Sequence, residues 1–113
     1  MGGAHSRNKG ANFERHIANV FKELGFKDAR RKIEYRDGAG YDVDGTGPWR
    51  IQAKRYKGYA PITKIEEVPK TSDTMPLLIT KADAKPAVAC MYLDDLIKVL
   101  SDIGKAYERE SNE

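Results

Sequence analysis

The chain has 113 residues, close to the commonest size of a single domain. Hydrophobic residues make up 40% and charged residues 33%, and no apolar run is long enough to cross a bilayer. The composition therefore favours a globular protein and excludes a membrane-spanning one. The single cysteine, Cys90, cannot form an internal disulfide, and no secretory signal is recognisable, so we expect an intracellular, cytoplasmic location.

The formal net charge is only +3, but charge is unevenly distributed along the chain. Basic residues crowd the first half, at Lys22, Lys27, Arg30, Arg31, Lys32, Arg36, Arg50, Lys54, Arg55 and Lys57. Acidic residues mark the C-terminal part, at Asp94, Asp95, Asp102, Glu108, Glu110 and Glu113. Such an asymmetry is typical of a protein with one surface facing a polyanion, although solvated faces would explain charge alone.

The first predicted elements are a flexible polar arm over residues 1–9 and a helix from about residue 10 to residue 24. Apolar side chains recur at helical spacing in this helix, at Phe13, Ile17, Val20, Phe21 and Leu24. Gly25 is a typical helix stop. Alternation predicts a half-exposed strand over residues 29–35, and a glycine-rich turn follows over residues 37–40.

The middle of the chain predicts a β-hairpin. Its strands cover residues 41–43 and 49–54, and residues 44–48 form the tight connection between them. Pro61 can open a short helix that ends at Pro69, because proline fits the first turn of a helix but not its interior.

The last third predicts two strands over residues 76–80 and 87–92, followed by a helix that Asp94 or Asp95 can cap. Residues 108–113 read as a polar tail. The order α-β-β-β-α-β-β-α predicts a single α/β domain over residues 10–107, with a central mixed β-sheet flanked by helices.

Side-chain alternation decides which groups of the hairpin can meet. Trp49, Ile51 and Ala53 share one strand face and suit a core, which leaves Arg50, Gln52 and Lys54 together on the other face. On the preceding strand Asp42 and Asp44 share a face. The hairpin can therefore set an acid beside Gln52 and Lys54, although Asp44, which precedes a glycine, is more typical of a turn.

These residues offer the oxygen atoms that a hard divalent cation prefers. Glu14 flanks the apolar stripe of the first helix, so it can lean toward the same sheet edge as Asp42 and Gln52. Together the three favour Mg²⁺ or Mn²⁺, which would polarise a phosphodiester and activate water. Lys54 could orient that water or stabilise the transition state. A surface ion pair is the commoner reason for an acid beside a lysine.

Two segments resemble a known nuclease family. Gly40-Tyr41-Asp42 followed by Gln52-Ala53-Lys54 looks like the PD-(D/E)XK nuclease motif. The helix opening Lys9-Gly10-Ala11-Asn12-Phe13-Glu14, with Gly25-Phe26 and a basic strand after it, is similar to archaeal-type Holliday junction resolvases and their phage relatives. The match covers about residues 8 to 100.

The resemblance implies a restriction-endonuclease-like fold and metal-dependent nicking of DNA. Glu14 and Asp42 would bind Mg²⁺ or Mn²⁺, and Lys54 would be the catalytic lysine. A homodimer would nick opposing strands of a four-way junction symmetrically, in the host cytoplasm if the chain is phage-encoded. Apolar positions around Ile62, Ile65 and the last helix are the expected dimer contact.

Gln52 departs from the motif, which has Glu or Asp at this position. A neutral amide binds a divalent ion less strongly than a carboxylate. Three interpretations are open. The site works with the Gln52 carbonyl oxygen and the Ala53 backbone carbonyl, Gln52 is a deliberate isosteric substitution that traps uncut DNA, or the protein is a natural non-cutting DNA binder. A restriction- or repair-type nuclease is a further alternative, but the chain is short for a separate sequence-reading domain.

DNA contacts are expected from cations and one aromatic residue near the candidate site: Arg7, Lys9, Arg30, Arg31, Lys32, Arg55, Tyr56 and Lys57. The arm residues among them can equally be solvated and idle. We expect no nucleotide cofactor, because Gly38, Gly40, Gly45 and Gly47 do not precede a helix as a phosphate-binding loop requires.

Overall fold

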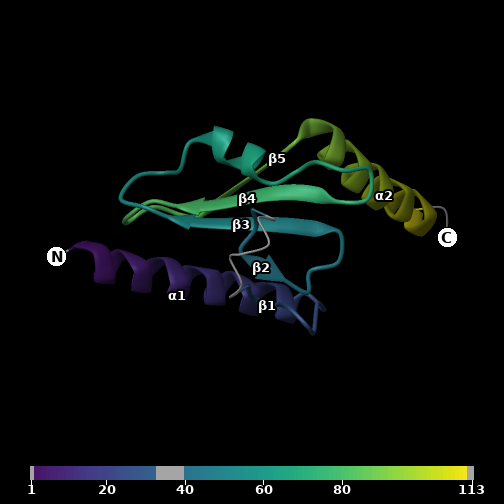
Figure 1. Ribbon diagram of the computed structural model, residues 1–113. Coiled ribbons are helices and arrows are strands. Elements are labelled where there is room, and N and C mark those ends of the chain that lie inside the picture. Colours follow the sequence, from purple (N-terminus) through teal and green to yellow (C-terminus); the bar gives the residue numbers. More distant parts are fainter. Residues whose placement is uncertain (1, 33–39, 112–113) are drawn as a thin grey trace.

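A computed structural model describes residues 2–32 and 40–111, with side chains from Lys9 onward. Within these residues the elements are α1 (Gly2–Glu23), β1 (Arg30–Arg31), β2 (Val43–Asp44), β3 (Trp49–Arg55), the 3-10 helix η1 (Ile62–Glu67), β4 (Met75–Lys81), β5 (Val88–Met91) and α2 (Leu93–Ser111). The expected single α/β domain with a mixed sheet and flanking helices is confirmed (Figure 1).

The five strands form one sheet in the order β1-β2-β3-β4-β5. β3 and β4 run parallel, and the other neighbours are antiparallel. The connection from β3 to β4 passes through η1, as a parallel pair requires a crossover. The predicted hairpin is confirmed, with Val43 opposite Ile51, although β2 has only two residues.

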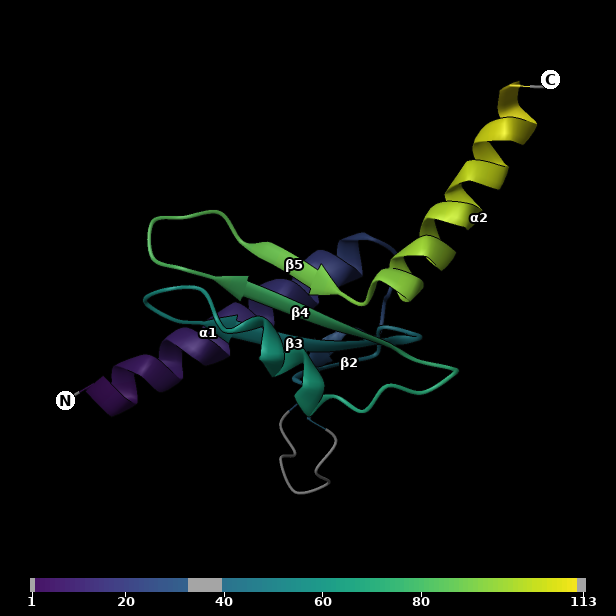
Figure 2. The same ribbon diagram turned by 90° about the horizontal axis from the view of Figure 1, so that it is seen from above.

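The sheet carries different layers on its two faces (Figure 1). α1 covers one face, where its apolar stripe meets the inward residues of three strands in one core cluster: Phe13, Ile17, Phe21, Val43, Ile51, Ala53, Leu77 and Ile79. η1 covers the other, with Ile65 and Leu78 buried. α2 leaves the end of β5 and projects beyond the sheet (Figure 2). No helix in residues 2–32 and 40–111 is long and apolar enough to cross a membrane.

The two ends of the chain differ from the sequence-based expectation. α1 begins at Gly2, so the predicted arm over residues 1–9 is replaced by helix from residue 2. Residues 4–9 contain neither proline nor glycine, so nothing in them stops the helix. α2 likewise continues to Ser111 through most of the predicted tail.

Three predicted elements are shifted or shortened. The strand expected over residues 29–35 is described only as β1, and residues 33–39, including most of the predicted turn, lie outside the described ranges. The helix expected after Pro61 is a 3-10 helix, which a six-residue segment between prolines can form more readily than a full α-helix. α2 begins at Leu93, so Asp94 and Asp95 lie in its first turn.

Candidate functional site

Among the described residues, β2 pairs with β3 no further than residue 51, because β2 is short. After Val43 pairs with Ile51, the Asp42 backbone N–H donates to the Ile51 carbonyl oxygen at 2.7 Å. The next outward amide of β3, on Ala53, donates instead to the Asp42 carboxylate oxygen Oδ2 at 2.9 Å. The Asp42 side chain thus takes the place of the next strand residue and lies in the plane of the sheet.

Lys54 and Glu14 reach the same edge from different elements. Lys54 Nζ lies 3.9 Å from Asp42 Oδ2. Glu14, on α1, accepts a hydrogen bond from Arg31 Nε at 2.5 Å, and its pKa responds to the charges of both Asp42 and Lys54. We call Glu14, Asp42, Gln52 and Lys54 the edge site.

Burial disfavours the ionised form of both acids of the edge site, although each has a cation beside it. Burial raises the pKa of the Glu14 carboxyl, and the neighbouring Asp42 charge raises it further, against the Arg31 hydrogen bond. Burial also raises the pKa of Asp42, although the Ala53 N–H and the Lys54 ammonium act in the opposite direction. A bound cation would favour the ionised form of both acids.

Gln52 lies on the strand face away from the α1 core, as alternation predicts, yet it is only 1% exposed. Its Nε2 donates to Glu67 Oε2 at 2.7 Å, and Glu67 Oε1 accepts from Lys64 Nζ at 2.9 Å. Gln52 Oε1 is buried without a hydrogen-bond partner in the described part of the chain. A buried amide oxygen without a partner is unusual and needs an explanation.

Glu67 is the acid that the sequence analysis missed. It ends η1 on the crossover from β3 to β4, and no motif spacing marks it. A Cβ on Gly40, which has a φ of +76°, would lie 2.1 Å from the Glu67 carbonyl oxygen. Only glycine fits this contact. The segment leading to Asp42 therefore packs directly on the backbone of Glu67, and the Glu67 charge raises the pKa of Asp42.

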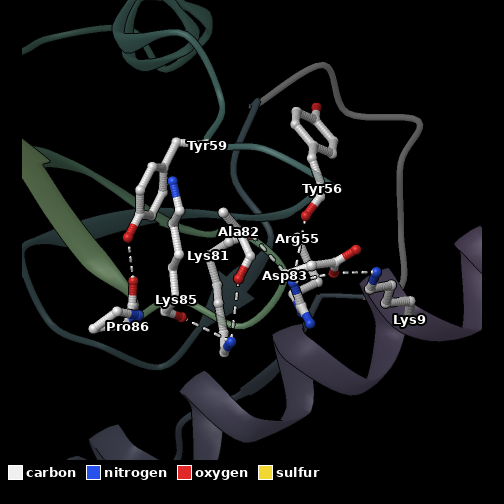
Figure 3. Close-up of polar contacts among 9 residues, drawn as sticks. All are labelled: Lys9, Arg55, Tyr56, Tyr59, Lys81, Ala82, Asp83, Lys85 and Pro86. Atoms are coloured by element: carbon white, nitrogen blue, oxygen red, sulfur yellow. Dashed lines mark hydrogen bonds and ion pairs between the residues drawn. The ribbon is translucent and has the colours of Figure 1, made fainter.

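A cleft of about 410 Å³ opens beside the edge site. Its lining includes Glu14 and Lys54 together with four predicted DNA-contact residues, Lys9, Arg55, Tyr56 and Lys57. Figure 3 shows Asp83 between two of these cations: Asp83 Oδ1 lies 2.6 Å from Lys9 Nζ and 2.9 Å from Arg55 Nη1. The turn after β4 thus holds the two cations at the cleft, a role for Asp83 that the sequence did not indicate.

Of the other predicted DNA-contact residues, Arg30, Arg31 and Lys32 are not among the described residues that line this cleft. Arg30 is exposed on β1, whereas Arg31 bonds Glu14. Lys32 Nζ lies 4.3 Å from the centre of the Tyr41 ring, in a cation–π contact. The side chain of Arg7 lies outside the described residues. Arg31 is therefore held by an acid of the edge site rather than presented outward.

The donor chemistry of the edge site fits a hard divalent cation. Two carboxyl groups have raised pKa values, and the unpaired Gln52 Oε1 is a neutral oxygen donor on the adjoining strand. No three His, Cys, Asp or Glu side chains form a metal-binding group in the described ranges. Glu14, Asp42 and Gln52 would therefore be the protein ligands, and a bound Mg²⁺ or Mn²⁺ would complete its coordination with several water molecules.

Comparisons with known proteins identify no relative of this chain. No protein-family model, curated protein or solved structure gives a match. The interpretation of the edge site therefore depends on its own geometry and on the spacing of its residues in the sequence.

Proposed function

We propose that the chain is a metal-dependent DNA endonuclease of the PD-(D/E)XK type that acts on four-way junctions. The observation that supports this most is the Asp42 carboxylate, fixed by the Ala53 amide beside Lys54 at the edge of β3. A carboxylate held beside a lysine that lines a cation-rich cleft provides the groups that phosphodiester hydrolysis needs.

The residues of the edge site have distinct roles in this proposal. Glu14 and Asp42 would supply carboxylate oxygens to Mg²⁺ or Mn²⁺, which would polarise the phosphate and lower the pKa of an attacking water. The Ala53 N–H holds Asp42 in one orientation. The Lys54 ammonium orients the water and stabilises the negative charge that develops on the phosphate. Arg31 keeps Glu14 directed toward the site.

The cleft residues would hold the DNA backbone. Lys9, Arg55 and Lys57 line the cleft beside Lys54 and can contact phosphates, with Asp83 holding the first two in place. Tyr56 is 40% exposed and can stack on a base that is splayed out of a duplex. Because these contacts are ionic, binding should weaken as the salt concentration rises.

Paired nicks in a junction require two edge sites, and α2 offers a surface for a second copy of the chain. The side chains of its apolar face are more than half exposed: Leu93, Ile97, Leu100, Ile103 and Tyr107. α2 also projects away from the sheet, so this face is accessible (Figure 2). We therefore place the homodimer contact on α2, with exposed Ile62 as a second candidate; Ile65, which the sequence also put forward, is buried.

A non-cleaving DNA-binding protein is the second candidate function. It is favoured by Gln52, which brings no charge to the position where the motif has an acid. A repair- or restriction-type nuclease would keep the edge site and differ only in its DNA substrate.

The test is cleavage of a labelled four-way junction and of a linear duplex with the same arms, in Mg²⁺ or Mn²⁺. The parent chain should nick the junction in symmetric pairs, and Lys54→Ala should lower the rate about 100- to 1000-fold while binding persists in a gel shift. Lys22→Ala, an exposed lysine on α1, is the control. Tight junction binding without cleavage in either metal would leave the non-cleaving function, and equal cleavage of both DNAs would remove junction selectivity.

A further inference from the structure

Gln52, which is 1% exposed, and Glu67, whose side chain is 45% exposed, form a pair with a defined hydrogen-bond direction. Gln52 Nε2 lies 2.7 Å from Glu67 Oε2, and a carboxylate can only accept this bond. The amide is therefore fixed with its nitrogen toward Glu67. Its oxygen, Oε1, remains buried with no partner in the part of the chain that the structure describes.

The same geometry is unsuited to an acid at position 52. A glutamate there would place a second carboxylate oxygen where the Gln52 amide nitrogen now lies, 2.7 Å from Glu67 Oε2. Two ionised carboxylates at this distance repel each other, so either one of them would bind a proton or the exposed Glu67 side chain would turn away and the bond would be lost. The fold around residue 52 therefore accommodates an amide better than the acid that the motif expects.

Glu67 also lies close to the acids of the edge site. Gly40 packs against the Glu67 backbone, and Asp42 follows two residues later in the same segment. Lys64 holds the second oxygen of Glu67 at 2.9 Å, which fixes this carboxylate from its other side. Glu67 thus brings one negative charge to the position that the Gln52 amide leaves neutral.

We propose that Gln52 and Glu67 together replace the missing acid of the motif: Gln52 Oε1 supplies the oxygen that faces the cation, and Glu67 orients the amide and supplies the charge. This inference rests on the proposed metal-dependent function. Glu67 is a positioning residue, because it acts through Gln52. Gln52 is then a working part of the site and not an inactivating substitution.

The first test is Mn²⁺ binding by calorimetry, without DNA. Glu67→Gln should weaken Mn²⁺ binding about 10- to 100-fold, because it removes the charge and replaces an acceptor-only group by an amide that no longer fixes the direction of the bond to Gln52. Glu66→Gln removes the same charge from the exposed neighbour and should change the affinity less than about threefold. Equal affinity of the parent and Glu67→Gln would overturn this inference alone. A parent chain that binds no Mn²⁺ would overturn the proposed function and this inference with it.

The second test is the thermal stability of the metal-free proteins in EDTA, which does not depend on cleavage. Gln52→Glu should lower the melting temperature by about 5 °C or more, because two carboxylates then face each other. The exchanged pair Gln52→Glu with Glu67→Gln restores one charge and one amide, so it should regain both the melting temperature and Mn²⁺ binding. A Gln52→Glu protein as stable as the parent, or an exchange that recovers neither property, would contradict the pairing.

Discussion

α1 and α2 have the same kind of sequence pattern and opposite surroundings. Both place apolar residues at helical spacing along one face. Ile17 in α1 is 6% exposed, whereas Ile97 in α2 is 57% exposed. α1 lies along the sheet, and α2 projects beyond it (Figures 1 and 2). Periodicity therefore shows that a helix face needs a partner, but it does not show whether that partner belongs to the same chain.

The difference follows from how each helix is attached. α1 packs along the core face of the sheet, so its stripe is covered over several turns. α2 is attached at its first turn, where Asp95 is buried and its Oδ2 lies 3.1 Å from Lys70 Nζ. All residues from 101 to 111 are exposed. The α1 stripe stabilises the monomer, and the α2 stripe is available for assembly.

The largest effect should come from truncating the covered stripe. Phe21→Ala removes a buried ring of the core cluster and should lower the free energy of unfolding by about 3–5 kcal/mol. Ile103→Ala, on the exposed stripe of α2, should lower it by less than about 0.5 kcal/mol in dilute protein. Urea unfolding of both variants measures the contrast. Similar losses in the two variants would mean that α2 packs on the domain in solution.

The next largest loss of stability should come from weakening the contact that attaches the first turn of α2. Lys70→Met removes the ammonium group beside Asp95. The Asp95 carboxylate, whose side chain is 2% exposed, is then buried without this positive charge. We expect a loss of about 1–3 kcal/mol in unfolding free energy. Lys98→Met, an exposed lysine of the same helix, is the control. If Asp95→Asn combined with Lys70→Met is no more stable than Lys70→Met alone, the stranded charge is not the cause.

A smaller change, this time a gain in stability, is expected from a substitution at the edge site. Burial raises the pKa of Asp42 in the folded state, so the folded protein favours the protonated acid. The contribution of Asp42 to stability is therefore present at low pH and is lost as the pH rises through its folded pKa. Asp42→Asn removes this ionisation. Its melting temperature should exceed that of the parent at pH 7, with the gain shrinking toward about pH 4. A gain that is constant with pH would exclude the ionisation as its cause.

The substitution with the smallest effect on the stability of the single chain should have the largest effect on dimerisation. Leu100→Ser changes a side chain that is 54% exposed, so the stability of a single chain should hardly change. Sedimentation analysis should show a dimer for the parent and a monomer for Leu100→Ser. Glu108→Gln, which keeps the apolar face, serves as the control. A parent that sediments as one chain at working concentration would remove α2 as the dimer contact.

The sequence predicted the parts that local patterns determine. Helical spacing located α1, and strand alternation placed Gln52 and Lys54 on the face opposite the core. It did not predict Glu67, because that carboxylate reaches Gln52 through the β3–β4 crossover, whose path depends on tertiary packing. Nor did spacing show that Val20 and Leu24 would be exposed: Val20 lies at the side of the stripe next to buried Phe21, and Leu24 follows the last residue of α1.

The most direct test of the edge site is a crystal of the protein soaked in Mn²⁺, with the metal located by its anomalous scattering. The account predicts one peak per chain, within coordination distance of an Asp42 carboxylate oxygen, about 2–2.5 Å, with Glu14 and Gln52 Oε1 around it. A strong peak elsewhere, for example beside Asp94 at the start of α2, and none at Asp42 would contradict a metal-dependent site at the edge of β3.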